Sequence, residues 1–288
     1  SGNQNLPGFI TMCPGYPIQE SQNWQSGFLP GVYQGTYIDT RKKTIDRLIE
    51  HIRNKKISLS EQRRQLNFIQ RLNQKHLQDR QNDRMLESRI QSFELAYRMQ
   101  LEATDAFDIE KEPPYIREMY GNGLQARQIL MARRLVEVGV PFVEVNLGGW
   151  DNHQGIHDIL QNQRLPTLDR AMSALSEDLE QRGMLENTAI IWMGEFGRTP
   201  TINGNAGRDH WARSWSVVVG GGGIKGGLAV GETDAEGRRV TSEPYSSEDL
   251  MATVCKGMGI NMETTYQSKS GRPMKIANGG KIIKELIA

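Results

Sequence analysis

The spacing of apolar residues predicts helices in several parts of the chain. In residues 41–101, which contain no proline or glycine, apolar residues recur every three or four positions. Ser58 followed by Glu61 has the sequence of a capping box, so we expect two long amphipathic helices here, packed as a hairpin. Further helices are predicted from Leu124 to Val138, from about Pro166 to Gly183, and from Ser247 to Met258.

Short apolar runs between these helices predict strands. The runs are Phe142–Leu147, Thr188–Met193 and Trp215–Val219. Residues 1–40 are rich in proline and glycine, which predicts irregular loop with at most one short strand near Phe9–Met12. Residues 102–122, with Pro113-Pro114, are also predicted to be loop. The alternation of helices with short strands predicts an α/β fold around a mainly parallel sheet.

Composition and charge exclude several classes of protein. The 288 residues carry 35 Lys+Arg against 34 Asp+Glu, which argues against a globally basic nucleic-acid binder. Cys13 and Cys255 are too few for a disulfide-rich scaffold, and no apolar run reaches the roughly 18–20 residues of a membrane helix. Residues 41–90 hold 14 Lys+Arg and 6 Asp+Glu. We interpret this excess as a solvated helix face, because few aromatic residues are present to stack bases.

Polar residues that could carry chemistry follow the first predicted strand. In open α/β sheets, ligands bind beyond the carboxyl ends of the strands. Asp151, His153 and His157 lie just after Phe142–Leu147, and the two histidines share one face if the segment is helical. A carboxylate with imidazoles suits a divalent cation such as zinc or manganese. The alternative is a hydrogen-bonded loop in which the aspartate caps a helix.

Two further clusters lie around the later strands. Glu195 and Arg198 follow Thr188–Met193, where Arg198 could form a structural salt bridge or hold an anionic substrate. Arg208, Asp209 and His210 precede the third strand, with His210 as a further imidazole ligand and Asp209 as a ligand or a residue that orients one. Together these residues predict a metal site for an anionic ester, with Arg198 and Arg208 neutralising the transferred group.

The glycine run does not indicate a nucleotide site. Gly221 to Gly226 matches the spacing GxGxxG, but the residues that follow do not form a helical pattern. We therefore predict a glycine-rich hairpin loop. The chain also contains no GxxxxGK[ST], GxSxG or HExxH motif.

Three motifs in this order resemble the bacterial domain-of-unknown-function family 1501. They are Gly149-Trp-Asp-Asn-His153, Gly194-Glu-Phe-Gly-Arg-Thr-Pro200 and Gly207-Arg-Asp-His210, and the likeness extends over nearly the whole chain. That family is often labelled sulfatase-like and is placed in the alkaline phosphatase superfamily. The resemblance implies an alkaline-phosphatase-like α/β sandwich with a mostly parallel sheet. Residues 1–288 would form a partial domain of this kind, with 41–101 as an inserted helical hairpin.

The resemblance also implies a function, namely metal-dependent hydrolysis of sulfate or phosphate esters, with sulfated polysaccharide as one substrate class. The metal would be zinc, calcium or manganese, held by Asp151, His153, Glu195 and His210, with His157 and Asp209 as further candidates. The resemblance implies export to the periplasm or outside the cell, without a membrane span. Family members are longer and the superfamily nucleophile lies upstream, so we expect the first strands to be missing and this fragment to be inactive.

Two departures from the superfamily pattern leave a second function open. Glu195-Phe196 stands where the superfamily has an Asp-His pair, so one imidazole is missing. The spacing from Asp151 to His153 is two residues, where four is usual. With the basic segment 41–90, these departures favour a non-catalytic module that binds anionic polysaccharide or a partner protein on the same fold.

Overall fold

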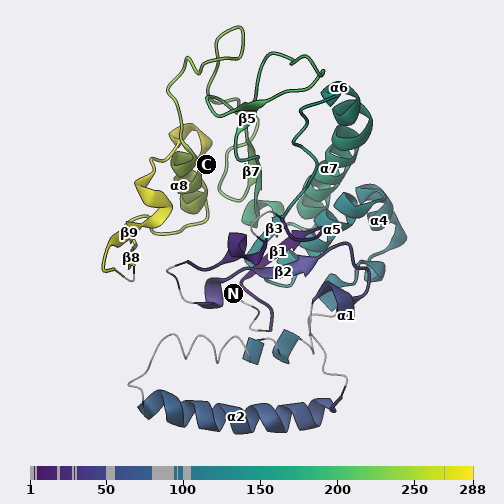
Figure 1. Cartoon of the computed structure of the whole chain (residues 1–288), viewed down its shortest axis with the longest axis vertical. Helices are drawn as coiled ribbons and strands as arrows, with labels where there is room; N and C mark the ends of the chain where they lie inside the picture. Colours follow the sequence, from purple (N-terminus) through teal and green to yellow (C-terminus); the bar gives the residue numbers. More distant parts are fainter. Residues whose placement is uncertain are drawn as a thin grey trace. The chain divides into compact units, whose positions relative to one another are not determined.

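The computed structural model describes residues 3–287 apart from 4, 18–19, 28, 30, 50–55, 80–93, 96, 100–104 and 269. Its helices and strands are labelled in Figure 1. The chain divides into two compact units, Ser1–Gly148 with Arg170–Leu175, and Gly149–Asp169 with Ser176–Ala288. The expectation of one partial α/β domain stays a prediction.

A three-stranded parallel sheet forms the centre of the first unit, in the order β2-β1-β3. The strands are β1 (Phe9–Cys13), β2 (Thr36–Asp39) and β3 (Phe142–Val145). Ile10 and Met12 on the central strand are completely buried. Thr11 between them is also completely buried, so the strand is covered on both faces, as is typical of a parallel sheet. The predicted strands near Phe9–Met12 and Phe142–Leu147 are confirmed.

Strand β2 shows that the expectation of at most one strand in residues 1–40 is wrong. Thr36 pairs with Ile10 and Asp39 with Cys13, so this segment becomes a strand through its long-range pairing with β1. Its local sequence, which follows Gly35, gives little signal. Short 3-10 turns occupy Glu20–Trp24, Gly31–Tyr33 and Ile109–Lys111.

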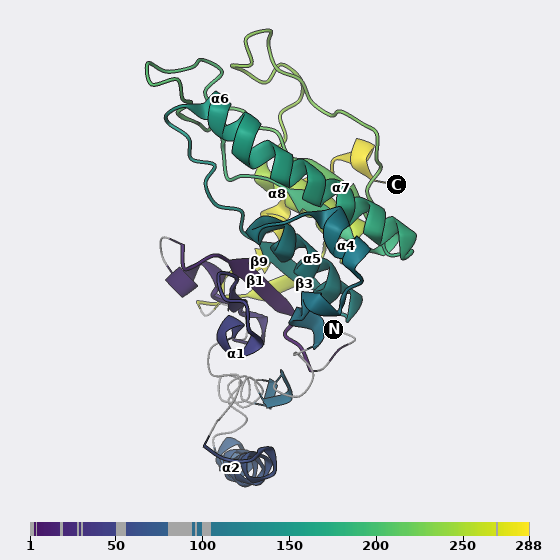
Figure 2. The same cartoon turned by 90° about the vertical axis from the view of Figure 1, so that its right-hand side faces the viewer.

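Helix α5 (Leu124–Glu137) packs against β3 and confirms the predicted helix (Figure 2). It is followed by Gly139, whose φ of +92° suits a residue without a side chain. Helix α4 (Pro114–Tyr120) corrects the predicted loop at 102–122. Pro114 occupies the first turn, where its missing N–H costs no hydrogen bond, and Ile116 and Tyr120 are buried in the cluster that α5 joins.

A buried ion cluster ties α5 to the segment before α4. The Arg133 side chain is fully buried, and its Nη2 lies 2.8 Å from Oε2 of Glu112. Arg134 also pairs with Glu112, and Arg133 with Glu137. Burial acts to raise the pKa of Glu112, but the two guanidinium groups outweigh it and hold the pKa below its usual value.

The basic segment contains α1 (Ile45–Leu48) and α2 (Leu59–Asp79). The predicted capping box is confirmed: the Ser58 N–H donates to Oε2 of Glu61 at 3.0 Å, and the Glu61 N–H donates to Oγ of Ser58 at 3.2 Å. The second helix of the predicted hairpin falls mainly on residues 80–93, outside the described residues. Helical residues appear again at 94–95 and 97–99.

The second unit contains short antiparallel strand pairs. Strands β4 (Ala189–Trp192) and β7 (Val218–Gly221) pair antiparallel, with Ile190 opposite Gly220. The expectation of a parallel arrangement is therefore wrong for this pair, and β7 begins three residues later than predicted. Gly221 has a φ of +72° and a Cβ there would overlap the Thr188 carbonyl, which explains a glycine at this turn. The other pairs are β5 (Gly197–Arg198) with β6 (His210–Trp211), and β8 (Thr265–Gln267) with β9 (Pro273–Lys275).

The helices predicted from about Pro166 to Gly183 and from Ser247 to Met258 are confirmed. Helix α6 (Ile156–Ile159) continues through a π-helical segment, Leu160–Arg164, into α7 (Leu165–Gln181). Helix α8 (Ser247–Gly257) begins with a capping box between Ser246 and Asp249. Short turns lie at Leu185–Asn187, Ile276–Gly279 and Lys284–Leu286. In the described part of the chain, none of the helices combines the length and apolar character needed to cross a membrane.

Candidate metal centre

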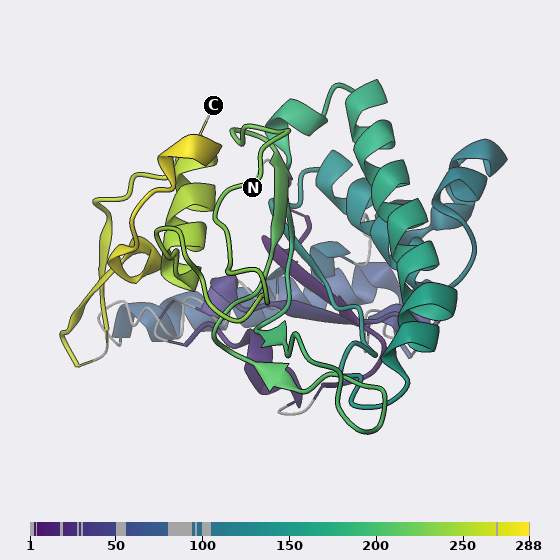
Figure 3. The same cartoon turned by 90° about the horizontal axis from the view of Figure 1, so that it is seen from above.

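Two loops of the second unit meet side by side and carry the candidate metal centre. One loop runs from Trp150 to α6, and the other joins β5 to β6, whose short arrows are visible in Figure 3. Backbone hydrogen bonds join the loops: the Arg208 N–H donates to the Asn152 carbonyl at 3.1 Å, and the Ile156 N–H donates to the Ala206 carbonyl at 2.8 Å. These hydrogen bonds hold the two loops, which are far apart in the sequence, in a fixed position relative to each other.

Gly207 allows the loops to approach this closely. It is buried, and a Cβ at this position would overlap the carbonyl group and following amide of His153. Its N–H donates to Oδ1 of Asn203 at 2.9 Å. The glycine at the start of the motif Gly207-Arg-Asp-His210 is therefore required by backbone contact with the loop that carries His153.

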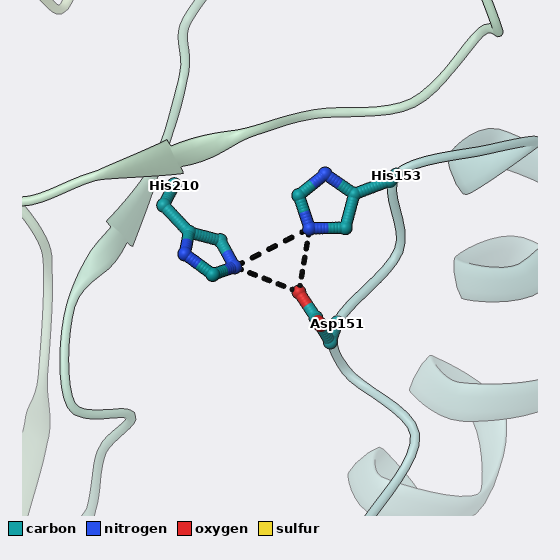
Figure 4. Close-up of side chains that lie close together, drawn as sticks. All are labelled: Asp151, His153 and His210. Carbon is teal, nitrogen blue, oxygen red and sulfur yellow. Dashed lines mark hydrogen bonds and ion pairs between the residues drawn. The ribbon is translucent and has the colours of Figure 1, made fainter.

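Asp151, His153 and His210 bring three potential ligand atoms together (Figure 4). Oδ1 of Asp151 lies 3.0 Å from Nε2 of His153 and 3.0 Å from Nε2 of His210. The two Nε2 atoms are 3.3 Å apart. Ligands about 2.1 Å from a tetrahedrally coordinated ion are separated by roughly 3.4 Å, so this triangle is close to one face of such a coordination sphere.

Asp209 fixes the orientation of His153. Oδ1 of Asp209 lies 2.7 Å from Nδ1 of His153 and accepts a hydrogen bond from Nδ2 of Asn203 at 3.1 Å. The hydrogen bond from His153 lowers the pKa of Asp209, and the bond from Asn203 adds to this effect. A histidine that donates from Nδ1 to a carboxylate and offers Nε2 to a cation is a common arrangement around metal ions.

Arg198 approaches the same carboxylate. Its Nη2 donates to Oδ1 of Asp151 at 2.6 Å, and its Nη1 donates to the Arg208 carbonyl at 3.3 Å. The hydrogen bond from Arg198, followed by that from His210, lowers the pKa of Asp151 to about 2. Asp151 therefore stays ionised at neutral pH, as a metal ligand must.

The other predicted site residues lie outside this cluster of three. His157 is exposed on α6, and Glu195 is exposed in the turn after β4; neither belongs to a candidate metal group among the described residues. Arg208 directs Nη1 to the carbonyl oxygens of Thr199 and Pro200, at 2.5 and 2.7 Å. It therefore holds the backbone of the β5–β6 loop in this structure.

Asn203 has a central role that the sequence did not reveal. Its Nδ2 also donates to the His153 carbonyl at 3.1 Å, and its Oδ1 also accepts from the Asn205 N–H at 2.9 Å. The hydroxyl oxygen Oγ1 of Thr199 accepts a hydrogen bond from the Asp209 N–H at 3.1 Å. The only local signal for Asn203 is the Asn-Gly pair it forms with Gly204, which is typical of a turn.

Comparison with known proteins identifies the family. Residues 1–287 match the family described as "Protein of unknown function (DUF1501)", and the chain belongs to it. The resemblance drawn from the three motifs is thus confirmed at the level of this family. No curated protein and no solved structure matches the chain significantly.

Proposed function

We propose that this protein is a metal-dependent hydrolase of sulfate or phosphate esters, with Asp151, His153 and His210 as ligands of a divalent cation. The observation that supports the proposal is the triangle formed by one carboxylate oxygen and two imidazole nitrogens, with edges of 3.0, 3.0 and 3.3 Å. The alkaline-phosphatase-like sandwich and an exported location belong to the same proposal, because they are implied by the family resemblance.

The chemistry of the donors favours a cation at this point. If His153 donates from Nδ1 to Asp209, the neutral ring directs a lone pair from Nε2 toward the Asp151 carboxylate, 3.0 Å away. Two acceptors at this distance repel each other, and the hydrogen bonds that Arg198 and His210 donate to Asp151 offset part of this repulsion. A divalent ion would instead bind the Asp151 oxygen and the Nε2 atoms of His153 and His210 together, with no proton held between them.

Two nitrogen donors and one oxygen donor also favour some metals over others. Zinc and manganese accept imidazole together with carboxylate, whereas calcium prefers oxygen ligands alone. Calcium, which the resemblance allows, is therefore a poorer fit to Asp151, His153 and His210 than zinc or manganese. Glu195, His157 and Asp209 remain proposed further ligands, and Asp209 fits better as the residue that orients His153.

The role we propose for Arg198 follows from its position. It already neutralises Asp151, and a guanidinium has five N–H donors, so further donors can bind the oxygens of an anionic ester. A divalent ion at such a site polarises the ester and lowers the pKa of an attacking hydroxyl. The side chains of Asp151, His153 and His210 are 66%, 43% and 53% exposed, so the site is open to a large substrate.

Hydrolysis of p-nitrophenyl sulfate and p-nitrophenyl phosphate tests the proposed activity, using the protein as its gene encodes it. We expect turnover that chelator removes and that zinc or manganese restores. Arg198→Ala should lower kcat/KM by at least about tenfold, because it removes a charged hydrogen-bond donor. Arg239→Ala removes the same charge from an exposed residue and is the matched control. Metal binding without hydrolysis of either ester would contradict the proposal.

A basic stripe on α2 supports a second candidate, a module that binds anionic polysaccharide. Arg64, Arg71 and Lys75 are exposed. Arg71 and Lys75 follow Arg64 by seven and eleven residues, which places all three on one face of the helix. Binding through this stripe would persist in chelator and weaken with salt. The variant Arg64→Gln/Arg71→Gln/Lys75→Gln should then lose retention on a sulfated column. Equal retention of the variant and the wild type would exclude this candidate.

A further inference from the structure

The carboxylate oxygen of the candidate metal centre is already bonded to an arginine. Nη2 of Arg198 donates to Oδ1 of Asp151 at 2.6 Å, and Nε2 of His210 lies 3.0 Å from the same oxygen. Oδ1 is also the Asp151 atom that lies 3.0 Å from Nε2 of His153. In this structure the guanidinium therefore supplies positive charge to the very oxygen that a divalent ion would bind.

A divalent ion would compete with Arg198 for this oxygen. An ion about 2.1 Å from Oδ1 of Asp151 would lie within about 4.7 Å of Nη2 of Arg198, because Nη2 is only 2.6 Å from that oxygen. Two positive charges at this separation repel each other. The ion would also draw on the lone pairs of an oxygen that already has two nitrogen donors beside it. Binding of the ion should thus weaken or break the hydrogen bond from Arg198.

Two other contacts hold the Arg198 side chain near the centre without Asp151. Nη1 donates to the Arg208 carbonyl at 3.3 Å, and Cζ lies 5.8 Å from the centroid of the Phe196 ring, within the range of a cation–π contact. Arg198 also lies opposite His210 in the β5–β6 pair, which fixes its backbone. Loss of the hydrogen bond to Asp151 would therefore leave a cationic donor beside the centre.

The state of Asp151 determines how well Arg198 can bind an anion. While the carboxylate is ionised and bonded to Nη2, it occupies this donor and repels an anion. A bound divalent ion would neutralise the carboxylate and release the donor, and free guanidinium donors bind sulfate or phosphate oxygens well. The side chains of Arg198 and Asp151 are 22% and 66% exposed, so ions in solution can reach the pair.

We propose that Arg198 couples metal binding to anion binding: it neutralises Asp151 in the metal-free protein, and it turns this donor to the anionic substrate when a divalent ion takes over the carboxylate. The inference rests on the proposed function, because it concerns the same metal centre and the same class of anion. Linkage makes the effect reciprocal, so sulfate or phosphate must also raise the affinity for the metal. The protein would thus bind its substrate well only when it is loaded with metal.

The competition between Asp151 and an anion can be tested in protein stripped of metal. Titration with sodium sulfate, followed by NMR, gives the Kd of the wild type, Asp151→Asn and the double variant Asp151→Asn/Arg198→Gln. We expect Asp151→Asn to bind sulfate about fivefold or more tightly than the wild type, because a neutral amide holds the guanidinium less strongly. The double variant should lose this gain. Equal sulfate affinities of Asp151→Asn and the double variant would overturn the proposal.

Zinc affinity measured by calorimetry tests the competition from the other side. Arg198→Gln should bind zinc about fivefold or more tightly than the wild type, because a competing positive charge is removed. A residue that merely supported the loops would give the opposite sign. Arg198→Lys keeps the charge and should stay close to the wild type. Arg239→Gln removes a charge from an exposed residue and should change the affinity by less than about twofold. Weaker zinc binding by Arg198→Gln would overturn the proposal.

The same titration in sodium sulfate, with sodium chloride of equal ionic strength as the reference, measures the coupling itself. Sulfate should raise the zinc affinity of the wild type about fivefold or more, and that of Arg198→Gln by a clearly smaller factor. Equal factors in the two proteins would show that sulfate acts without Arg198 and would overturn the coupling.

The two proposals fail separately, because the affinities are measured without turnover. Coupled binding of zinc and sulfate without hydrolysis of p-nitrophenyl sulfate or p-nitrophenyl phosphate would reject the hydrolase and keep the coupling. Hydrolysis by a protein that binds zinc and sulfate independently would keep the hydrolase and reject the coupling. A wild type that binds no zinc or manganese would overturn both.

Discussion

At the scale of single residues, the proton on His153 determines what this ring can bind. Oδ1 of Asp209 lies 2.7 Å from Nδ1 and thereby reserves that nitrogen for donation, which leaves Nε2 for the cluster with Asp151 and His210. The carboxylate acts through the imidazole and does not need to contact a metal itself.

Replacing Asp209 should therefore weaken metal binding without removing a ligand from the triangle. We expect Asp209→Asn to lower the zinc affinity by about 10- to 100-fold, measured by calorimetry at neutral pH. Asp158→Asn, which changes an exposed carboxylate on α6, is the matched control and should bind zinc as the wild type does. An unchanged affinity in Asp209→Asn would show that His153 needs no orienting partner.

The ionisation of Glu112 affects how the stability of the first unit changes with pH. Its pKa is lowered because Arg133 and Arg134 outweigh the effect of burial, so its ionised form stabilises the fold above the ordinary value near 4.5. The stabilisation by the ionised Glu112 should decrease once the pH falls below 4.5, and it should be lost when the pH reaches the lower pKa of the folded state. Removal of the carboxylate from a buried ion pair costs about 3–5 kcal/mol.

We therefore expect Glu112→Ala to lower the free energy of unfolding by about 3–5 kcal/mol at pH 7, measured with urea. The difference from the wild type should shrink steadily below pH 4.5. Glu118→Ala, on the exposed face of α4, should stay within about 0.5 kcal/mol. A difference for Glu112→Ala that is the same at pH 3 and pH 7 would show that its charge is unimportant.

At the scale of elements, the site depends on how closely two loops approach. Gly207 contacts the backbone of His153, and Arg208 donates its N–H to the Asn152 carbonyl at 3.1 Å. A methyl group at position 207 must push these loops apart, since backbone atoms cannot move aside as a flexible side chain can.

Gly207→Ala should therefore abolish zinc binding at micromolar concentrations although every proposed ligand is still present. Gly204→Ala is the matched control, because a Cβ there meets no atom within 4 Å. Calorimetry measures the affinity and circular dichroism checks that the fold is retained. Normal zinc binding by folded Gly207→Ala would contradict the arrangement of the two loops.

The elements also show which parts of the fold could be predicted from the sequence. Helices α5, α7 and α8 were predictable because each has a regular apolar stripe and a glycine just beyond its end. Strand β2 and the antiparallel pairing of β4 with β7 were not, because both depend on partners distant in the sequence. Helix α4 was missed because Pro113-Pro114 was interpreted as a loop signal, although proline is favoured in a first helical turn.

The sequence predicted the main ligands of the candidate site but not the backbone contacts that position them. The motifs indicated Asp151, His153 and His210 as chemically suited ligands, and the structure brings their ligand atoms together. The sequence could not show that Glu195 and His157 lie apart from them, because the direction of a loop is set by its backbone contacts. The roles of Asn203 and Gly207 depend on those same contacts.

At the scale of the whole molecule, the described residues contain one cluster of histidine, cysteine and acidic side chains suited to a metal ion, that of Asp151, His153 and His210. The protein should therefore bind about one equivalent of zinc or manganese per chain. His157 provides a control, because it is an exposed histidine only four residues from His153 and lies outside the cluster.

Zinc titration by calorimetry of the wild type, His153→Ala and His157→Ala tests the central claim most directly. We expect one equivalent bound by the wild type and by His157→Ala, and a loss of affinity of at least about 100-fold in His153→Ala, because an imidazole ligand is removed. A wild type that binds no zinc or manganese, or equal losses in both histidine variants, would contradict a metal centre at Asp151, His153 and His210.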